Sequence, residues 1–158
     1  MRCSSLTTVS FSLCKSIGNS AFYYCSKLTT INFPSCLSIG ISAFYYCYKL
    51  TTVDFPVCKV VSNYALGNCY SLTTASFPSC VSIYNYAFVN CYNLTSLYLT
   101  GSSVAGLINS TAFNSTPIAG YTTSTGGVYG SIFVPSSLYN TYISSTNWVY
   151  FSSRFVSV

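Results

Sequence analysis

Apolar and polar side chains recur along the first 116 residues with a period of 22. Each unit carries a leucine, an aliphatic residue three positions later, and a phenylalanine or leucine two positions after that. The three columns are Leu6, Leu28, Leu50, Leu72 and Leu94; Val9, Ile31, Val53, Ala75 and Leu97; and Phe11, Phe33, Phe55, Phe77 and Leu99. Repetition at about 20–50 residues is typical of solenoids, in which each unit buries its apolar edge on its neighbours.

Alternation within each unit predicts a short strand. The segment 30–33, TINF, alternates polar and apolar residues as a half-buried strand does. Pro34 ends this strand, because proline cannot donate to a ladder of hydrogen bonds. We expect a second short strand at 36–39 and a single helical or 3-10 turn at 43–47. The spacing L-x-x-[IVL]-x-[FL] is that of a leucine-rich repeat.

The period ends in the fifth unit. The Ala-Phe pair at 112–113 follows the pair at 87–88 by 25 residues, which implies a three-residue insertion around 101–110. We therefore divide the chain in two. Residues 1–116 are expected to form a β-rich leucine-rich-repeat solenoid of about five 22-residue coils, and residues 117–158 a small α+β C-terminal cap.

The cap is predicted in more detail from its own sequence. Residues 117–130 favour a loop, because they are rich in glycine, serine and threonine. A strand is expected at 131–134, followed by a short helix over 138–143 with Ser136 or Ser137 as its N-cap. The aromatic residues expected to cover the last coil are Trp148, Tyr150, Phe151 and Phe155.

The N-terminal end of the solenoid has no comparable segment. Its first coil would present Leu6, Val9 and Phe11 at an open end. An uncovered strand edge invites pairing with another chain. We expect either upstream repeats in a longer protein or a partner, including a second copy, at this edge.

The repeats resemble the BspA-like leucine-rich repeat family of bacterial and protist surface proteins. The matching segments are KLTTINFPSCLSIGISAF, KLTTVDFPVCKVVSNYAL and SLTTASFPSCVSIYNYAF, within residues 3–116. The resemblance implies a right-handed solenoid, a cell-surface or extracellular location, and adhesion or ligand binding without catalysis. Residues 130–155 are similar to closing segments found after such repeats in gut-bacterial and phage-encoded proteins.

The composition removes most catalytic chemistry. The 158 residues include no histidine and a single carboxylate side chain, Asp54. A Ser-His-Asp triad, a pair of catalytic carboxylates and a carboxylate cage for calcium or magnesium are therefore impossible. We predict that the protein is not an enzyme and that it uses neither a cofactor nor a metal ion.

Charge and hydropathy narrow the range of partners. The net charge is +5, but six Lys and Arg residues scattered along the chain do not make the concentrated patch that nucleic-acid binding requires. The mean hydropathy is +0.48, yet polar residues interrupt every apolar stretch, so no membrane span is expected. The first residues lack the apolar region of a secretory signal peptide.

Nine cysteines recur every 11 residues, at positions 3, 14, 25, 36, 47, 58, 69, 80 and 91. Each occupies a repeat column, and free cysteine behaves as a small, usually buried hydrophobe. We interpret them as reduced, buried thiols. Disulfides stay open as an alternative, because stacked strands about 4.8 Å apart would permit bridges. Metal binding is disfavoured by the lack of histidine and of any C-x-x-C motif.

Outward strand positions form two polar columns, our candidate ligand-binding face. The columns are Thr8, Thr30, Thr52, Thr74 and Ser96, and Ser10, Asn32, Asp54, Ser76 and Tyr98. Solenoid faces often bind ligands, although threonine is also a favourable exposed strand residue in its own right. Threonine columns occur on ice-binding surfaces as well, but the regular T-x-T spacing of those surfaces is missing.

Tyrosines gather on the segment that carries the predicted turn. They are Tyr23, Tyr24, Tyr45, Tyr46, Tyr48, Tyr70 and Tyr92. Such side chains suit protein or sugar contacts, or they pack against neighbouring coils.

The leading hypothesis is a non-catalytic adhesion or recognition module at a bacterial cell surface, which binds a protein or glycan through the two polar columns. A phage virion or tail-associated protein that recognises a host surface is the first alternative, favoured by the missing signal peptide and the resemblance of the cap. A structural spacer is the second.

Overall fold

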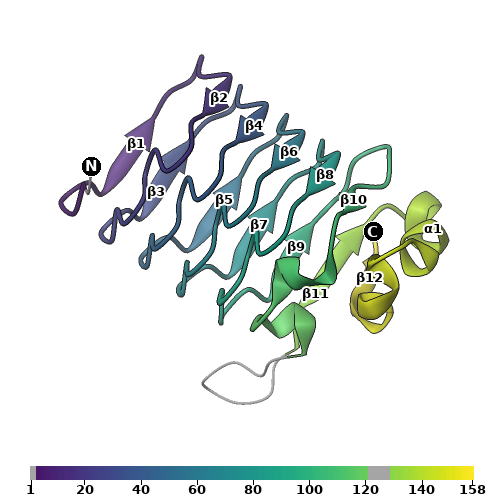
Figure 1. The fold of residues 1–158 in the computed structure, drawn as a ribbon. Helices are drawn as coiled ribbons and strands as arrows, with labels where there is room; N and C mark the ends of the chain where they lie inside the picture. Colours follow the sequence, from purple (N-terminus) through teal and green to yellow (C-terminus); the bar gives the residue numbers. More distant parts are fainter. Residues whose placement is uncertain (1–2, 121–128) are drawn as a thin grey trace.

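The computed structural model describes residues 3–120 and 129–158 as a stack of coils closed at one end by the C-terminal segment (Figure 1). Each coil contributes one strand to each of two faces. The first set of strands is β1 (Thr8–Ser10), β3 (Thr30–Asn32), β5 (Thr52–Asp54), β7 (Thr74–Ser76) and β9 (Ser96–Tyr98). The second set is β2 (Ser16–Ile17), β4 (Ser38–Ile39), β6 (Val60–Val61), β8 (Ser82–Ile83) and β10 (Gly106–Leu107).

All strand pairs of the described residues are parallel, and those among β1 to β9 join residues 22 positions apart. Val9 lies opposite Ile31, and Ile17 lies opposite Ile39. The second set makes one five-stranded sheet in the order β10-β8-β6-β4-β2. The first set divides into a β1-β3 pair and a sheet in the order β12-β11-β9-β7-β5, so two strands of the cap extend it. These observations confirm the β-rich solenoid of 22-residue coils.

The core consists of identical side chains stacked from coil to coil. Phe55 and Phe77 are fully buried, with ring centroids 5.5 Å apart and planes 8° apart. Phe22 and Phe44 stack in a second column at 5.2 Å. Offset stacking of aromatic rings adds to the free energy gained from burial. The three apolar columns of the sequence therefore line the interior of the solenoid, except that Phe11, in the first coil, is exposed.

The segment predicted as a single helical or 3-10 turn is a succession of hydrogen-bonded turns. The Tyr45 amide donates to the Ser42 carbonyl at 3.2 Å, and the Cys47 amide donates to the Phe44 carbonyl at 3.1 Å. The Phe44 amide points instead to the next coil and donates to the Ala65 carbonyl at 2.8 Å. These turns thus join neighbouring coils as the strands do.

Two positions in these turns have left-handed backbone conformations. The residues at the first position are Ser20, Ser42, Tyr64 and Tyr86, and those at the second are Tyr24, Tyr46, Asn68 and Asn90. Asparagine tolerates positive φ well, whereas a bulky side chain there is a backbone outlier that costs about 1–3 kcal/mol. Four tyrosines therefore have a left-handed backbone conformation that glycine or asparagine would adopt at lower cost.

The C-terminal segment combines short helices with two strands. η1 (Ser110–Phe113) still belongs to the last coil. In chain order the C-terminal segment then contains η2 (Pro117–Ala119), β11 (Ser131–Val134), η3 (Ser136–Leu138), α1 (Tyr139–Ser144), η4 (Trp148–Arg154) and β12 (Phe155–Ser157). The predicted strand at 131–134 is confirmed by β11, and the predicted helix lies one residue later than expected, in α1.

Three details of the predicted cap are wrong. Part of the expected loop 117–130 forms η2, capped by the Thr116 side chain, while 121–128 lie outside the described residues. Neither expected serine caps the helix, because both lie inside η3, which runs directly into α1, and the Ser136 hydroxyl donates instead to the Val158 carbonyl at 3.0 Å. Tyr150 is 73% exposed and covers nothing.

Candidate functional site

The ten predicted face residues lie side by side on the first set of strands. Parallel pairing brings Thr8 opposite Thr30 and Ser10 opposite Asn32. The same register continues from β5 through β7 to β9. Together these residues form the strand face, which is defined as Thr8, Thr30, Thr52, Thr74, Ser96, Ser10, Asn32, Asp54, Ser76 and Tyr98.

Exposure changes along the strand face. The six members on β1, β3 and β5 are exposed, whereas the four on β7 and β9 are half-buried. Tyr98 lies against Phe133 of β11, with ring centroids 4.5 Å apart and planes 11° apart. The most accessible part of the face is therefore its N-terminal half, which also holds Asp54.

Short neutral groups provide the chemistry of the strand face. The Asn32 side-chain amide donates to the Ser10 hydroxyl at 3.2 Å, across the two strands. Hydroxyl and amide groups both donate and accept hydrogen bonds, so such a surface can pair with peptide or sugar groups. Asp54 adds one negative charge at the edge strand of the longer sheet.

Two further members of this face were missed in the sequence. Ser131 pairs with Ser96, and Phe133 pairs with Tyr98, so β11 continues both columns into the cap. A signal was present: residues 131–135, SIFVP, repeat the out-in-out-in-proline order of residues 30–34, TINFP. β11 follows β9 by 35 residues, so this match lies outside the 22-residue period.

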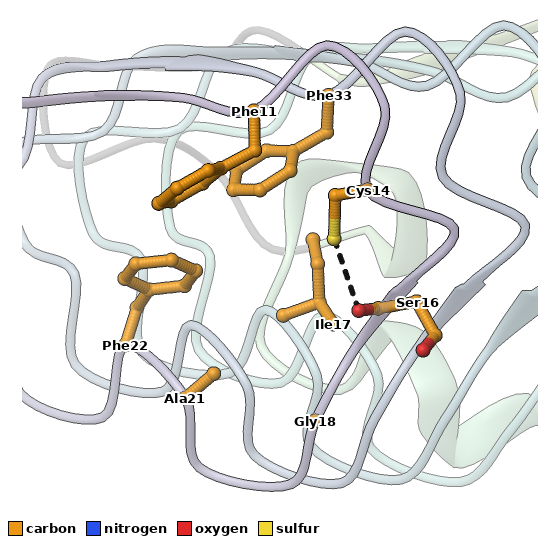
Figure 2. Close-up of a pocket in the computed structure, with 8 residues that line it drawn as sticks. All are labelled: Phe11, Cys14, Ser16, Ile17, Gly18, Ala21, Phe22 and Phe33. Atoms are coloured by element: carbon orange, nitrogen blue, oxygen red, sulfur yellow. Dashed lines mark hydrogen bonds between the residues drawn. The ribbon is translucent and has the colours of Figure 1, made fainter.

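An apolar pocket of about 230 Å³ opens at the N-terminal end of the solenoid (Figure 2). Phe11, Phe22 and Phe33 form one side of it, and Cys14 and Ile17 form the other. Phe11 is 55% exposed, although its counterparts in later coils are buried. The pocket is the face of the first coil that, in every later coil, is covered by the preceding one.

The cysteines are free thiols arranged in two columns. Seven are buried, Cys14 is half-buried and Cys3 is exposed. In one column, the thiols of Cys69 and Cys91 donate to the carbonyls of Phe44 and Leu66. In the other, the Cys58 thiol donates to the Val60 carbonyl two residues later. The prediction of buried thiols thus holds for seven of the nine.

Burial keeps these thiols protonated. It raises the pKa of the Cys58, Cys80 and Cys91 thiols to about 12, because the anion would lose its hydration. Burial also raises the pKa of the other four, which are Cys25, Cys36, Cys47 and Cys69. Because the thiolate is the reactive form of cysteine, none of the seven has the character of a nucleophile.

We predict that only Cys3 and Cys14 react rapidly with a neutral maleimide in native buffer, and that all nine react after denaturation. A Cys3→Ser/Cys14→Ser variant should therefore give almost no native signal. The free energy of unfolding should also fall above pH 9.0, the ordinary thiol pKa, because only the unfolded chain then loses these protons. Rapid native labelling of more than two thiols, or bridges found by mass spectrometry, would contradict this arrangement.

Neither a metal site nor a membrane-spanning helix is found where the structure is described. Residues 3–120 and 129–158 hold no group of three or more histidine, cysteine or acidic side chains that could bind a metal ion. None of their helices has the length and apolar character needed to cross a bilayer.

Comparison with known families gives one match. The family model described as BspA type leucine rich repeat region matches residues 15–138 in six copies. The match therefore runs beyond residue 116 and includes β11, in agreement with the continuation of the sheet into the cap. No curated protein matches the chain.

Proposed function

Because the chain belongs to the BspA-type leucine-rich repeat family, we propose that it is a non-catalytic recognition module that binds a protein or glycan through its strand face. This family consists of repeat modules for protein interaction. The observation that carries the proposal is the regular register of short polar groups, within β1 and β3 and again from β5 to β9, whose six N-terminal members are exposed. A regular, rigid array of donors and acceptors suits recognition, since little conformational entropy is lost on binding.

The proposed setting is a bacterial cell surface, where the module would contribute to adhesion. The family resemblance supports this location. The absence of histidine and of a second carboxylate side chain supports a binding role over a catalytic one, because neither a pair of catalytic carboxylates nor a histidine-based acid-base pair can be assembled.

Self-association through the N-terminal pocket belongs to the same proposal. Phe11, which lines this pocket, is 55% exposed, and Leu13 is 83% exposed; within the part of the chain that the structure describes, β1 pairs with β3 alone. When the 158-residue chain is produced alone, a second copy could cover these apolar groups in a head-to-head dimer.

The strand face is tested by binding to a panel of extracellular-matrix proteins and glycans. We expect a Thr30→Arg/Thr52→Arg variant to weaken any binding found by about tenfold, since two bulky charges would stand in the contact surface. The matched control, Leu37→Arg/Val81→Arg, adds the same charges at exposed positions near the second sheet and should leave affinity within about twofold.

Two outcomes would contradict the proposed function. One is equal loss of binding in both variants, which would indicate a general effect of charge. The other is a purified protein that binds nothing on the panel, which would favour a spacer role.

A further inference from the structure

A row of tyrosines follows the corner of the solenoid that precedes the strand face. The tyrosine row is defined as Tyr24, Tyr46, Tyr48, Tyr70 and Tyr92. Tyr48 and Tyr70 stack with ring centroids 5.1 Å apart, and Tyr70 and Tyr92 stack at 5.3 Å. Tyr24 contacts Tyr46 at 5.5 Å and Tyr48 at 5.6 Å, both edge to face. The row therefore runs without interruption over four coils.

The stacking determines what the row presents to a ligand. Tyr70 and Tyr92 are 36% and 41% exposed, although each has a ring face covered by a neighbouring tyrosine. The exposed surface thus consists largely of ring edges and hydroxyl groups. A phenolic hydroxyl donates and accepts hydrogen bonds, and it recurs here once per coil, about every 4.8 Å if coils are spaced as paired strands are.

Backbone strain sets part of this row apart from ordinary packing. Tyr24 and Tyr46 have positive φ angles, of 60° and 66°. In the next two coils the same position holds Asn68 and Asn90, for which this conformation is well tolerated. A tyrosine kept at a strained position is a reason to look for a role in binding.

Two lysines lie beside the row and give it a charge. Lys27 and Lys49 are exposed, occupy equivalent positions in adjacent coils, and Lys49 directly follows Tyr48. The sole carboxylate side chain of the protein, Asp54, lies on the strand face instead. Lys27 and Lys49 therefore add positive charge next to the tyrosine row, and the single carboxylate side chain lies on another part of the surface.

We propose that the tyrosine row, with Lys27 and Lys49, is a second binding surface that takes an anionic polysaccharide running along the solenoid. A surface that repeats the same group at every coil fits a ligand that also repeats. The two lysines select for acidic sugars by charge complementarity. This assignment goes beyond the proposed function, since it concerns other residues and one ligand class.

The test compares two polymers that differ only in charge: polygalacturonate and the same polymer with its carboxyl groups methyl-esterified. We expect the intact protein to bind the acid form, with affinity that falls as salt is added, and to bind the ester at least about tenfold more weakly. Equal binding of both forms, or of neither, would overturn the proposal. Binding of polyglutamate as tightly as polygalacturonate would overturn the assignment to a polysaccharide.

Matched variants locate the surface. Lys27→Gln/Lys49→Gln should weaken binding about tenfold, whereas Lys15→Gln/Lys59→Gln, which removes two charges next to the second sheet, should change it less than about twofold. If both lysine pairs weakened binding equally, the affinity would depend only on the net charge of the protein, and the proposal would be overturned.

The tyrosine hydroxyls are tested in the same way. Tyr70→Phe/Tyr92→Phe should weaken binding about threefold, and Tyr150→Phe, in the exposed part of the cap, should leave it unchanged. No effect of the double variant would show that the row makes no contact. Thermal melting confirms that each variant is folded.

The Thr30→Arg/Thr52→Arg variant, compared with the control Leu37→Arg/Val81→Arg, should keep its affinity for polygalacturonate. A loss specific to the former would place the polymer on the strand face and overturn this inference while leaving the proposed function intact.

Discussion

Deletion of residues 131–158 is expected to make the remaining chain aggregate and lose its cooperative unfolding transition. The deleted segment supplies β11, which pairs with β9. It also supplies Trp148 and Phe151, whose ring centroids lie 5.9 and 5.5 Å from that of Phe113 in the last coil. Without them, buried apolar groups and a free strand edge would face water, and such edges pair with other chains. Light scattering and a thermal unfolding curve measure both effects.

A single substitution tests the same region without removing the segment. Trp148 is 1% exposed, and its indole Nε1 donates to the Ala105 carbonyl, so Trp148→Ala should cost about 3–5 kcal/mol of unfolding free energy. Tyr150→Ala, two residues away and 73% exposed, should cost less than about 0.5 kcal/mol. Similar losses for both variants would show that the cap contributes no specific packing.

The Ala105 peptide explains why the cap docks where it does. Its carbonyl accepts from Trp148, and its amide donates to the Tyr142 hydroxyl at 2.9 Å. A buried peptide group without partners would cost free energy, so the cap satisfies both groups while it covers the apolar core. Asn147 adds hydrogen bonds to the carbonyls of Leu107 and Ile108.

The repeats could be predicted from sequence because every constraint on them recurs. A coil that must stack on its copies fixes the same side chain at the same place in successive coils: leucine occurs five times in the column of Leu28, and phenylalanine four times in the column of Phe33. Because the pattern occurs five times, the strands, their register and the buried positions can all be predicted from it. The outward columns follow from the same alternation, so the strand face was also predictable as geometry.

The cap was less predictable because each of its contacts occurs once. Nothing in the sequence around Ser136 shows that its hydroxyl bonds to the Val158 carbonyl and leaves the helix uncapped. Similarly, Tyr150 and Trp148 are both aromatic residues of one short helix, and only its orientation decides which is buried. The continuation of the face into β11 was hidden by the length of the intervening chain.

The tyrosine row shows a different gap between sequence and structure. The sequence places tyrosines on the turn segment, but their stacking and the positive φ angles of Tyr24 and Tyr46 depend on how the turns of adjacent coils bond to each other. The Tyr24 amide donates to the Tyr45 carbonyl, and the Tyr46 amide donates to the Gly67 carbonyl. These contacts between coils fix a conformation that no single repeat would favour.

The phenylalanine column allows identical substitutions to be compared at a covered and an uncovered coil. Phe55 is fully buried between Phe33 and Phe77, whereas Phe11 is 55% exposed at the N-terminal pocket. Phe55→Ala should cost about 3–5 kcal/mol of unfolding free energy, because it leaves a cavity between stacked rings. Phe11→Ala should cost less than about 1.5 kcal/mol, because much of its side chain already contacts water.

Self-association should respond to the two substitutions in the opposite order. Sedimentation of the 158-residue chain at several concentrations is expected to show a dimer that Phe11→Ala weakens, since this change removes apolar surface at the pocket. Phe55→Ala, measured where it is still folded, should leave the dimer unchanged, because its side chain reaches no surface. A chain that stays monomeric at every concentration would contradict the head-to-head pairing, and equal destabilisation by both substitutions would show that the first coil is already covered.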